Sequence, residues 1–244
     1  FSLIVLSLIL VGAGCLGRSN KATGNDGGVF KSVNAGEDWT QTVAVPTSAG
    51  IGTLATTDVL DMEMDPQDKS FIYLGTRQNG LLYSEDGGAS WRQPRVSALK
   101  DGLVYSVDVS PQDVCTIYVA KGSRLFSTSD CMRTFDSDAY VDNRSGVNVV
   151  QVTADWFNDK VVWIGLSNGD VLKSDNGGDT WRTVLKTDEE ISGILIHNKD
   201  SRNVLVSTFD KGIWKTSDGG SNWMELGDAL KDYRGSQKVY SMVQ

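Results

Sequence analysis

Short runs of alternating apolar and polar residues recur along most of the chain. The segment "LDMEMDPQDKSFIYLGTRQNGLLYS" begins with such a run, and successive residues of an extended chain point to opposite sides. Leu60, Met62 and Met64 would then face one way, and Asp61 and Glu63 the other. The segment "YSVDVSPQDVCTIYVAKGSRLFSTS" repeats the same order of strand, turn, strand and short apolar strand. This pattern predicts β-strands joined by tight turns.

A turn motif follows each of these units and occurs five times. The copies are "SVNAGEDW" from Ser32, "SEDGGASW" from Ser84, "TSDCMRTF" from Thr128, "SDNGGDTW" from Ser174 and "TSDGGSNW" from Thr216. Their closing aromatic residues are Trp39, Trp91, Phe135, Trp181 and Trp223, which are 52, 44, 46 and 42 residues apart. This spacing is typical of a four-stranded propeller blade. We therefore predict an all-β fold, a β-propeller of four-stranded blades whose radial arrangement protects the sheet edges.

The conserved spacing within the motif has a structural explanation. An aspartate in a tight turn accepts hydrogen bonds from backbone N–H groups that follow it, and a glycine adopts positive φ without steric cost. The closing tryptophan lays a large apolar ring over the blade. We assign these structural roles to Ser84, Asp86, Gly88 and Trp91, to Ser174, Asn176, Gly178 and Trp181, and to Thr216, Asp218, Gly220 and Trp223. A catalytic acid in every blade is not expected, because one reaction needs only one set of catalytic residues.

The N-terminal residues predict export. "FSLIVLSLILVGAGC" is uncharged and has the length of a signal-peptide apolar region, too short for a spanning helix. No start methionine precedes Phe1, so we expect residues 1–14 to be an incomplete signal peptide. The run from Gly12 to Cys15 resembles a bacterial lipobox, which implies a lipid on Cys15, although Gly12 stands where an aliphatic residue is usual. Ordinary cleavage and a plain apolar anchor are the alternatives. Residues 15–23 have the composition of a flexible tether, and residues 24–244 form the predicted propeller.

The third turn motif departs from the others. Cys131 and Met132 stand at its glycine positions, and Phe135 replaces tryptophan, so we expect a weaker turn. Cys115 lies in the first turn of the same blade, at the same end of the sheet. Because an exported protein meets oxidising conditions, we predict a Cys115–Cys131 disulfide that staples this blade. The alternative is two small apolar residues that do not meet.

Composition narrows the choice of partners. The 244 residues are 40% hydrophobic and 22% charged, with 26 glycines, and the formal net charge is −8. Such a chain lacks the basic surface that binds a nucleic-acid backbone, so no nucleic-acid partner is expected. His197 is the only histidine, which leaves no basis for a histidine metal site or triad. We expect no cofactor and no metal.

The C-terminal residues "KVYSMVQ" copy the opening of a blade, "LVYSVDV" from Leu103. We expect the chain to stop in mid-blade, as part of a ring of six to eight blades. The alternative is that these residues complete the first blade and close a smaller ring.

The loops that join second to third strands would lie opposite the turn motifs. With the links between blades they form our candidate binding face: Asn25, Asp26, Arg77, Asn79, Lys121, Arg124, Asn168, Asp170, Asp210 and Lys211. The alternative is that these are solvated turn residues, since loops are polar whether or not they bind.

The repeat resembles the BNR or Asp-box family, whose pattern is Ser-x-Asp-x-Gly-x-Thr-Trp. "GTRQNGLLYSEDGGASW" and "GLSNGDVLKSDNGGDTW" look like the repeats of photosystem II assembly factor-like and sortilin-type propellers. That resemblance implies an exported scaffold that binds or assembles an envelope protein or a glycan, with a lipid anchor in the membrane. "NDGGVFKS" resembles a stretch that carries a catalytic aspartate in xyloglucanase-type glycoside hydrolases, which would make Asp26 half of a carboxylate pair. Asp170 or Asp210 would supply the second carboxylate. Sialidases share the Asp-box, but their arginine cluster and tyrosine nucleophile are not found.

Overall fold

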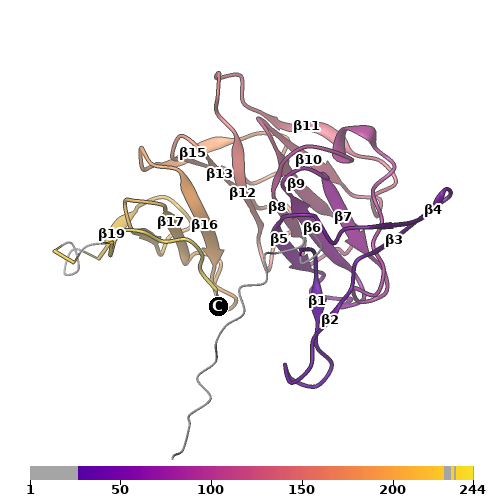
Figure 1. Cartoon of the computed structure of the whole chain (residues 1–244). Helices are drawn as coiled ribbons and strands as arrows, with labels where there is room; N and C mark the ends of the chain where they lie inside the picture. Colours follow the sequence, from indigo (N-terminus) through magenta and orange to yellow (C-terminus); the bar gives the residue numbers. More distant parts are fainter. Residues whose placement is uncertain (1–26, 228–231, 234, 244) are drawn as a thin grey trace, which may run out of the picture.

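The computed structural model describes residues 27–227, 232–233 and 235–243. Four antiparallel sheets stand side by side in an arc (Figure 1). The prediction of an all-β propeller is confirmed. The predicted signal peptide, Cys15, the tether, Asn25 and Asp26 lie outside the described residues. In the described part, no helix is long and apolar enough to span a membrane.

We call the four sheets blades A to D in chain order. Blade A contains β5 (Val59–Met64), β6 (Ile72–Thr76) and β7 (Leu81–Ser84). Blade B contains β8 (Val104–Val109), β9 (Ile117–Lys121), β10 (Arg124–Thr128) and β11 (Asp136–Val141). Blade C contains β12 (Val149–Ala154), β13 (Val162–Leu166), β14 (Asp170–Ser174) and β15 (Arg182–Lys186). Blade D contains β16 (Ile191–Ile196), β17 (Val204–Thr208), β18 (Ile213–Thr216) and β19 (Met224–Leu226).

Two hairpins precede blade A, and one short helix follows it. The hairpins are β1 (Phe30–Lys31) with β2 (Thr40–Gln41), and β3 (Ala44–Thr47) with β4 (Gly50–Thr53). The 3₁₀ helix η1 (Ser97–Leu99) is the one helical segment among the described residues. β1 and β2 flank the first turn motif, as the third and fourth strands of a blade do.

The first strands of successive blades, β5, β8, β12 and β16, lie beside one another. Carboxylates of one such strand bind the backbone of the next. Asp61 Oδ2 accepts a hydrogen bond from the Val107 N–H at 2.7 Å, and Asp108 Oδ2 accepts one from the Ala154 N–H at 2.5 Å. These bonds satisfy backbone donors on the innermost strands and join blade A to blade B and blade B to blade C.

The turn motifs are closed by the same side-chain bonds in each blade. In the second motif, Ser84 Oγ donates to Asp86 Oδ1 at 2.8 Å and accepts from the Gly88 N–H at 2.8 Å, while Asp86 Oδ1 also accepts from the Ser90 N–H. Hydrogen bonds from Ser90 hold the pKa of Asp86 down to about 2. Equivalent bonds close the turns of Thr128, Asp130, Met132 and Thr134, of Ser174, Asn176, Gly178 and Thr180, and of Thr216, Asp218, Gly220 and Asn222.

The closing tryptophans dock onto the preceding blade. The Trp91 indole donates to the Thr42 carbonyl at 2.8 Å, and the Trp181 indole donates to the Ala139 carbonyl at 2.7 Å. Trp91 is fully buried. Trp39 has no described blade before it and is 62% exposed. The motifs that end in Trp91 and Trp181 therefore close their own hairpins and also fasten two neighbouring sheets together.

The third motif keeps the turn geometry without its glycines. Cys131 and Met132 have φ values of 56° and 64°, in the left-handed region that the glycines of the other motifs occupy. Such a conformation costs a residue with a side chain roughly 1 kcal/mol or more. The structure joins Cys131 to Cys115 in a disulfide, with the Cα atoms 4.0 Å apart. The cross-link holds the strained turn against the first turn of the same blade.

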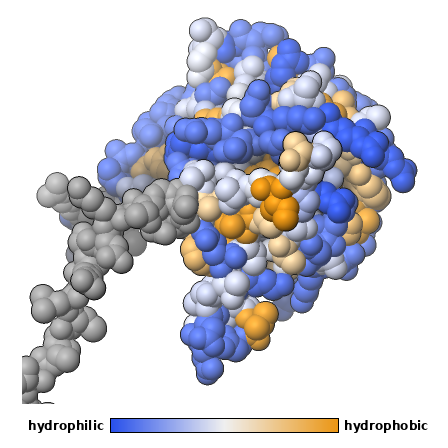
Figure 2. Space-filling model, turned by 45° about the vertical axis from the view of Figure 1, so that its right-hand side comes forward, coloured by the Kyte–Doolittle hydropathy of each residue, from blue (hydrophilic) through white to orange (hydrophobic). Residues whose placement is uncertain are grey.

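The two ends of the arc differ. At blade A, Leu60, Met62 and Met64 are exposed on the outer side of β5, and Figure 2 shows several separate apolar areas among polar residues when this side comes forward. At blade D, the Gly212 N–H donates to the Gln237 carbonyl at 2.8 Å. In blade A, the Gly80 N–H donates to the Gly102 carbonyl at the equivalent position. Residues 237–243 thus lie beside blade D as the opening of blade B lies beside blade A.

Candidate functional site

The two faces of the arc are defined by backbone bonds at the ends of the strands. On one face, each motif turn contacts the first turn of its own blade, through bonds from Gly87 to Ser70, from Gly177 to Lys160 and from Gly219 to Arg202. On the other, the loops between second and third strands meet the links between blades, through bonds from Val149 to Gly122, from Thr187 to Gly169 and from Phe209 to Glu190. We call the first the motif face and the second the loop face. The described residues of our candidate binding face lie on the loop face.

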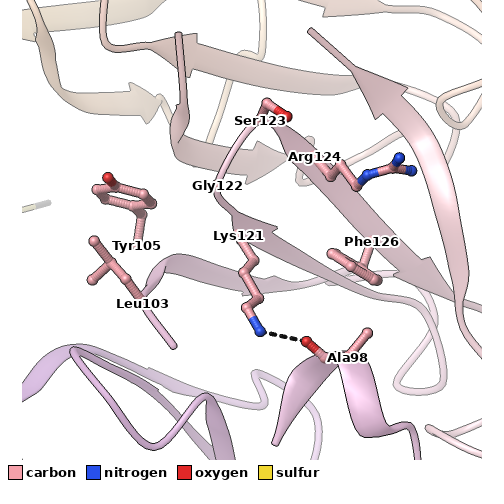
Figure 3. A pocket seen from close by; sticks show the side chains of 8 residues that line it. All are labelled: Ala98, Leu103, Tyr105, Lys121, Gly122, Ser123, Arg124 and Phe126. Carbon is pink, nitrogen blue, oxygen red and sulfur yellow. Dashed lines mark hydrogen bonds between the residues drawn. The ribbon is translucent and has the colours of Figure 1, made fainter. Parts of the chain in front are cut away.

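A pocket of about 410 Å³ opens in blade B on the loop face. Figure 3 shows Leu103 and Tyr105 on one side, Phe126 and Arg124 on the other, and Lys121 between them. Tyr105 belongs to β8, and the other strand residues flank the loop from β9 to β10. The walls are mainly apolar, so the pocket suits an apolar or ring-shaped group.

Both basic residues of this pocket are held by neighbouring acceptors. Lys121 Nζ donates to the Ala98 carbonyl at 2.5 Å and to Asp101 at 3.2 Å. Arg124 pairs with Asp138, and its guanidinium points away from Tyr105 (Figure 3). The pocket therefore has a positive rim whose charges are largely compensated, which favours a neutral or weakly charged ligand.

Asp170 is built into an ion-pair network and is not a free surface carboxylate. It is 5% exposed, and its Oδ2 accepts hydrogen bonds from Arg144 at 2.6 Å and from Asn168 at 2.9 Å. Arg144 also binds Asp142, which accepts the Tyr140 hydroxyl. Burial alone would raise the pKa of Asp170, but the hydrogen bonds from Arg144 and Asn168 lower it. The network joins blades B and C on the loop face.

The remaining candidate residues do not converge on one site. Arg77 pairs with Asp58 at 3.4 Å, and Asp210 lies 3.7 Å from Lys238. Asn79 is exposed in its loop, next to Gly102, and Lys211 is exposed at the far end of the arc. Of the candidate residues that lie within the described part of the chain, Lys121 and Arg124 share one pocket.

Sequence reasoning missed the aromatic walls of the pocket and the arginine of the network. Tyr105 and Phe126 lie within apolar strands, where a large side chain is expected in the core. Arg144 lies in a link, "DNRSG", with no motif around it. The position of Tyr105 could have indicated its role. It lies three residues after Gly102, near the start of β8, and this end of the strand is on the loop face.

The inner surface of the arc carries a second polar region. Asp61, Glu63 and Asp108 line a hollow of about 370 Å³ formed by the first strands of all four blades. Burial raises the pKa of Glu63 to about 7, and the nearby charges of Asp61 and Asp65 add to this. Burial also raises the pKa of Asp61 and Asp108. Among the described residues, no group of three or more His, Cys, Asp or Glu side chains is placed to hold a metal ion.

Comparison with known proteins finds one similar curated protein and no matching family model. No family model matches the chain. A xyloglucanase from Paenibacillus sp is 25% identical over 217 residues, which cover 83% of this chain and 18% of the relative. The chain thus spans about a fifth of the length of this curated relative.

Solved structures show the same architecture at low identity. The GH74 enzyme of Niastella koreensis matches with a TM-score of 0.60 and 16% identity, over 80% of this chain and 33% of that one. The extracellular domain of BT4673 from B. thetaiotaomicron matches with a TM-score of 0.57 and 17% identity, over 80% of this chain and 24% of that one. YCF48 from Cyanidioschyzon merolae matches with a TM-score of 0.52 and 15% identity, over 69% of this chain and 56% of that one. The chain is a β-propeller whose fold is similar to those of GH74 enzymes, of YCF48 and of the BT4673 extracellular domain.

Proposed function

We propose that this chain is the propeller of an exported, lipid-anchored protein that binds an envelope protein or a glycan on its loop face. The observation that carries the proposal is the pocket of blade B, where Leu103, Tyr105 and Phe126 offer apolar walls beside two compensated cations. An apolar pocket with a few polar groups is the usual form of a ligand site. Similarity to an extracellular propeller domain supports a location outside the cytoplasm.

A photo-crosslinking residue at Ser123, on the rim of the pocket, tests this proposal in the full chain in its native envelope. We expect a discrete adduct that is lost when Tyr105→Ala removes one wall. A crosslinker at Ser129, on the motif face, is the matched control and should not give that adduct. The same adduct from both positions, or none from Ser123 with either protein or glycan, would contradict the proposal.

Glycoside hydrolysis is the second candidate, favoured by the similarity to a xyloglucanase. Asp26 would be one of two carboxylates that act about 5–5.5 Å or 6.5–9.5 Å apart. The partners suggested by the sequence are poorly suited, because Asp170 is ion-paired to Arg144 and Asp210 lies beside Lys238. Release of reducing sugar from xyloglucan by the wild type, lost in Asp26→Ala, would establish the enzyme. No release by either protein would favour the binding scaffold.

A further inference from the structure

A second pocket, of about 450 Å³, lies between blades A and B on the motif face. One wall is a row of cross-strand neighbours of blade A: Tyr73 on β6, Tyr83 on β7, and Arg92 bridged to Tyr83. The opposite wall is the irregular motif turn of blade B, with Met132 and Arg133. Because it lies on the opposite face of the arc, this pocket is distinct from the loop-face pocket and depends on different residues.

The chemistry of this pocket combines an aromatic wall with unpaired cations. Arg95 and Arg133 line it, are exposed, and have no carboxylate partner in the part of the chain that the structure describes. Arg92, the third arginine, is bound to Glu85 at 2.9 Å. Two guanidinium groups without a carboxylate partner, in a pocket that Tyr73 and Tyr83 also line, form a suitable site for a carboxylate attached to a ring, since arginine binds a carboxylate in a planar, bidentate manner.

A tyrosine hydroxyl is also available to a ligand. Tyr73 lines the pocket and is 2% exposed as a whole residue. Its hydroxyl has no hydrogen-bond partner among the described residues and is not sealed from solvent, so it can donate to a molecule in the pocket. Burial raises its pKa, and the charges of Asp65, Glu85 and Asp68 around the same pocket add to this. The hydroxyl is therefore a neutral donor in the pocket.

The acidic residues of the pocket decide between possible anions. Asp65, Asp68 and Glu85 line it together with the arginines, so the pocket offers hydrogen-bond acceptors as well as donors beside its aromatic wall. A doubly charged phosphate would be repelled by these carboxylates. A sugar acid carries one negative charge and several hydroxyl donors, which match two arginines and three carboxylates. We propose that this pocket binds a uronic-acid residue of an acidic polysaccharide.

The proposal is tested by calorimetric titration of the full chain with tri-galacturonate. We expect binding that weakens with added salt, because one charged contact dominates. The double variant Arg95→Ala/Arg133→Ala should lower the affinity at least tenfold, and Tyr73→Phe, which removes only the hydroxyl, about three- to tenfold. Arg202→Ala, an exposed arginine on the motif face of blade D, is the matched control and should leave the affinity unchanged.

Neutral cellotriose and inorganic phosphate are the control ligands. Both should bind at least tenfold more weakly than tri-galacturonate. Equal binding of cellotriose would overturn the role of the carboxylate, and tighter binding of phosphate would overturn the choice of a sugar acid. Absence of tri-galacturonate binding at millimolar concentration would overturn the proposal outright. A Tyr105→Ala variant, which disrupts the loop-face pocket, should bind tri-galacturonate normally, so failure of one site does not imply failure of the other.

Discussion

The gap between blades A and B and the gap between blades C and D are built from equivalent positions but differ in content. In each, a row of cross-strand neighbours faces the motif turn of the next blade. The rows are Glu63, Tyr73, Tyr83 and Arg92 in blade A, and Thr153, Trp163, Lys173 and Arg182 in blade C. In blade C, Trp163 is fully buried, packs edge-on against Trp223 and lies under Lys173 Nζ at 5.0 Å. That gap is closed, whereas the blade A gap holds a pocket of about 450 Å³.

This difference shows that the two glycine positions of the motif turn control the space between blades. A Cβ on Gly220 would lie 2.8 Å from the Trp163 ring, so the glycine is what admits the tryptophan. In the third motif, Cys131 and Met132 stand at the glycine positions, and the facing residue is the narrower Tyr73. The gap between blades C and D thus contributes stability, while the gap between blades A and B keeps polar groups accessible to a ligand.

Removal of Trp163 should have the largest effect. Trp163→Ala leaves a cavity between blades C and D, and large aromatic-to-alanine changes in a core cost about 3–5 kcal/mol. Tyr83→Ala, at the half-buried position of the open gap, should cost about 1 kcal/mol. Urea unfolding of both variants measures the difference. Equal losses would mean that the two gaps are packed alike.

Loss of the disulfide should have the next largest effect. Cys115→Ser/Cys131→Ser frees a loop with a sequence separation of 16, for which the chain-entropy model gives about 3 kcal/mol. A reducing agent should lower the unfolding free energy of the wild type by a similar amount and leave the double variant unchanged. A wild type that is insensitive to reduction would contradict the proposed role of the cross-link.

A methyl group on Gly220 should be less costly, at about 2 kcal/mol. Gly220 has a φ of 94°, which side chains rarely adopt, and the new Cβ would press on Trp163. Ala35, in the first motif, already holds a φ of 58° at the position that Gly219 occupies in the last motif. Ala35→Gly is therefore the control and should change stability by less than 1 kcal/mol in thermal unfolding. A tolerated Gly220→Ala would show that the ring does not need the glycine.

Glu63 should give the smallest effect, visible only as a pH dependence. Burial, with Asp61 and Asp65 nearby, raises its folded pKa from 4.5 to about 7. The folded chain thus binds more protons than the unfolded chain between these values, and stability falls as pH rises through this window. Glu63→Gln should abolish that fall and be about 1 kcal/mol more stable at pH 8, less than the full shift implies because the carboxyl is only partly buried. A variant less stable than wild type at pH 8 would contradict the raised pKa.

Much of the fold was predictable because it repeats. The period of the closing aromatics and the alternation in runs such as that from Leu60 to Met64 depend on local geometry, which each blade satisfies in the same way. Cys115 and Cys131 were predictable as neighbours, because adjacent turns of an up-and-down sheet fall at one end.

The sites were less predictable, since they depend on which side chains meet across blades. Asp170 was expected on a binding surface, yet Arg144, from a link without a motif, draws it into a buried network. Tyr73 and Tyr83 follow an ordinary strand pattern. Only the pairing of that strand row with the irregular turn of the next blade shows that they line a pocket.

The most direct test of this account is a ¹H–¹⁵N NMR titration of the full chain with tri-galacturonate. The account predicts shifts confined to the open gap, at Tyr73, Tyr83, Arg95 and Arg133, with none at Trp163 or Lys173 in the closed gap. Shifts at the closed gap, or no shifts at millimolar ligand, would contradict the claim that the third motif turn keeps a ligand pocket open between blades A and B.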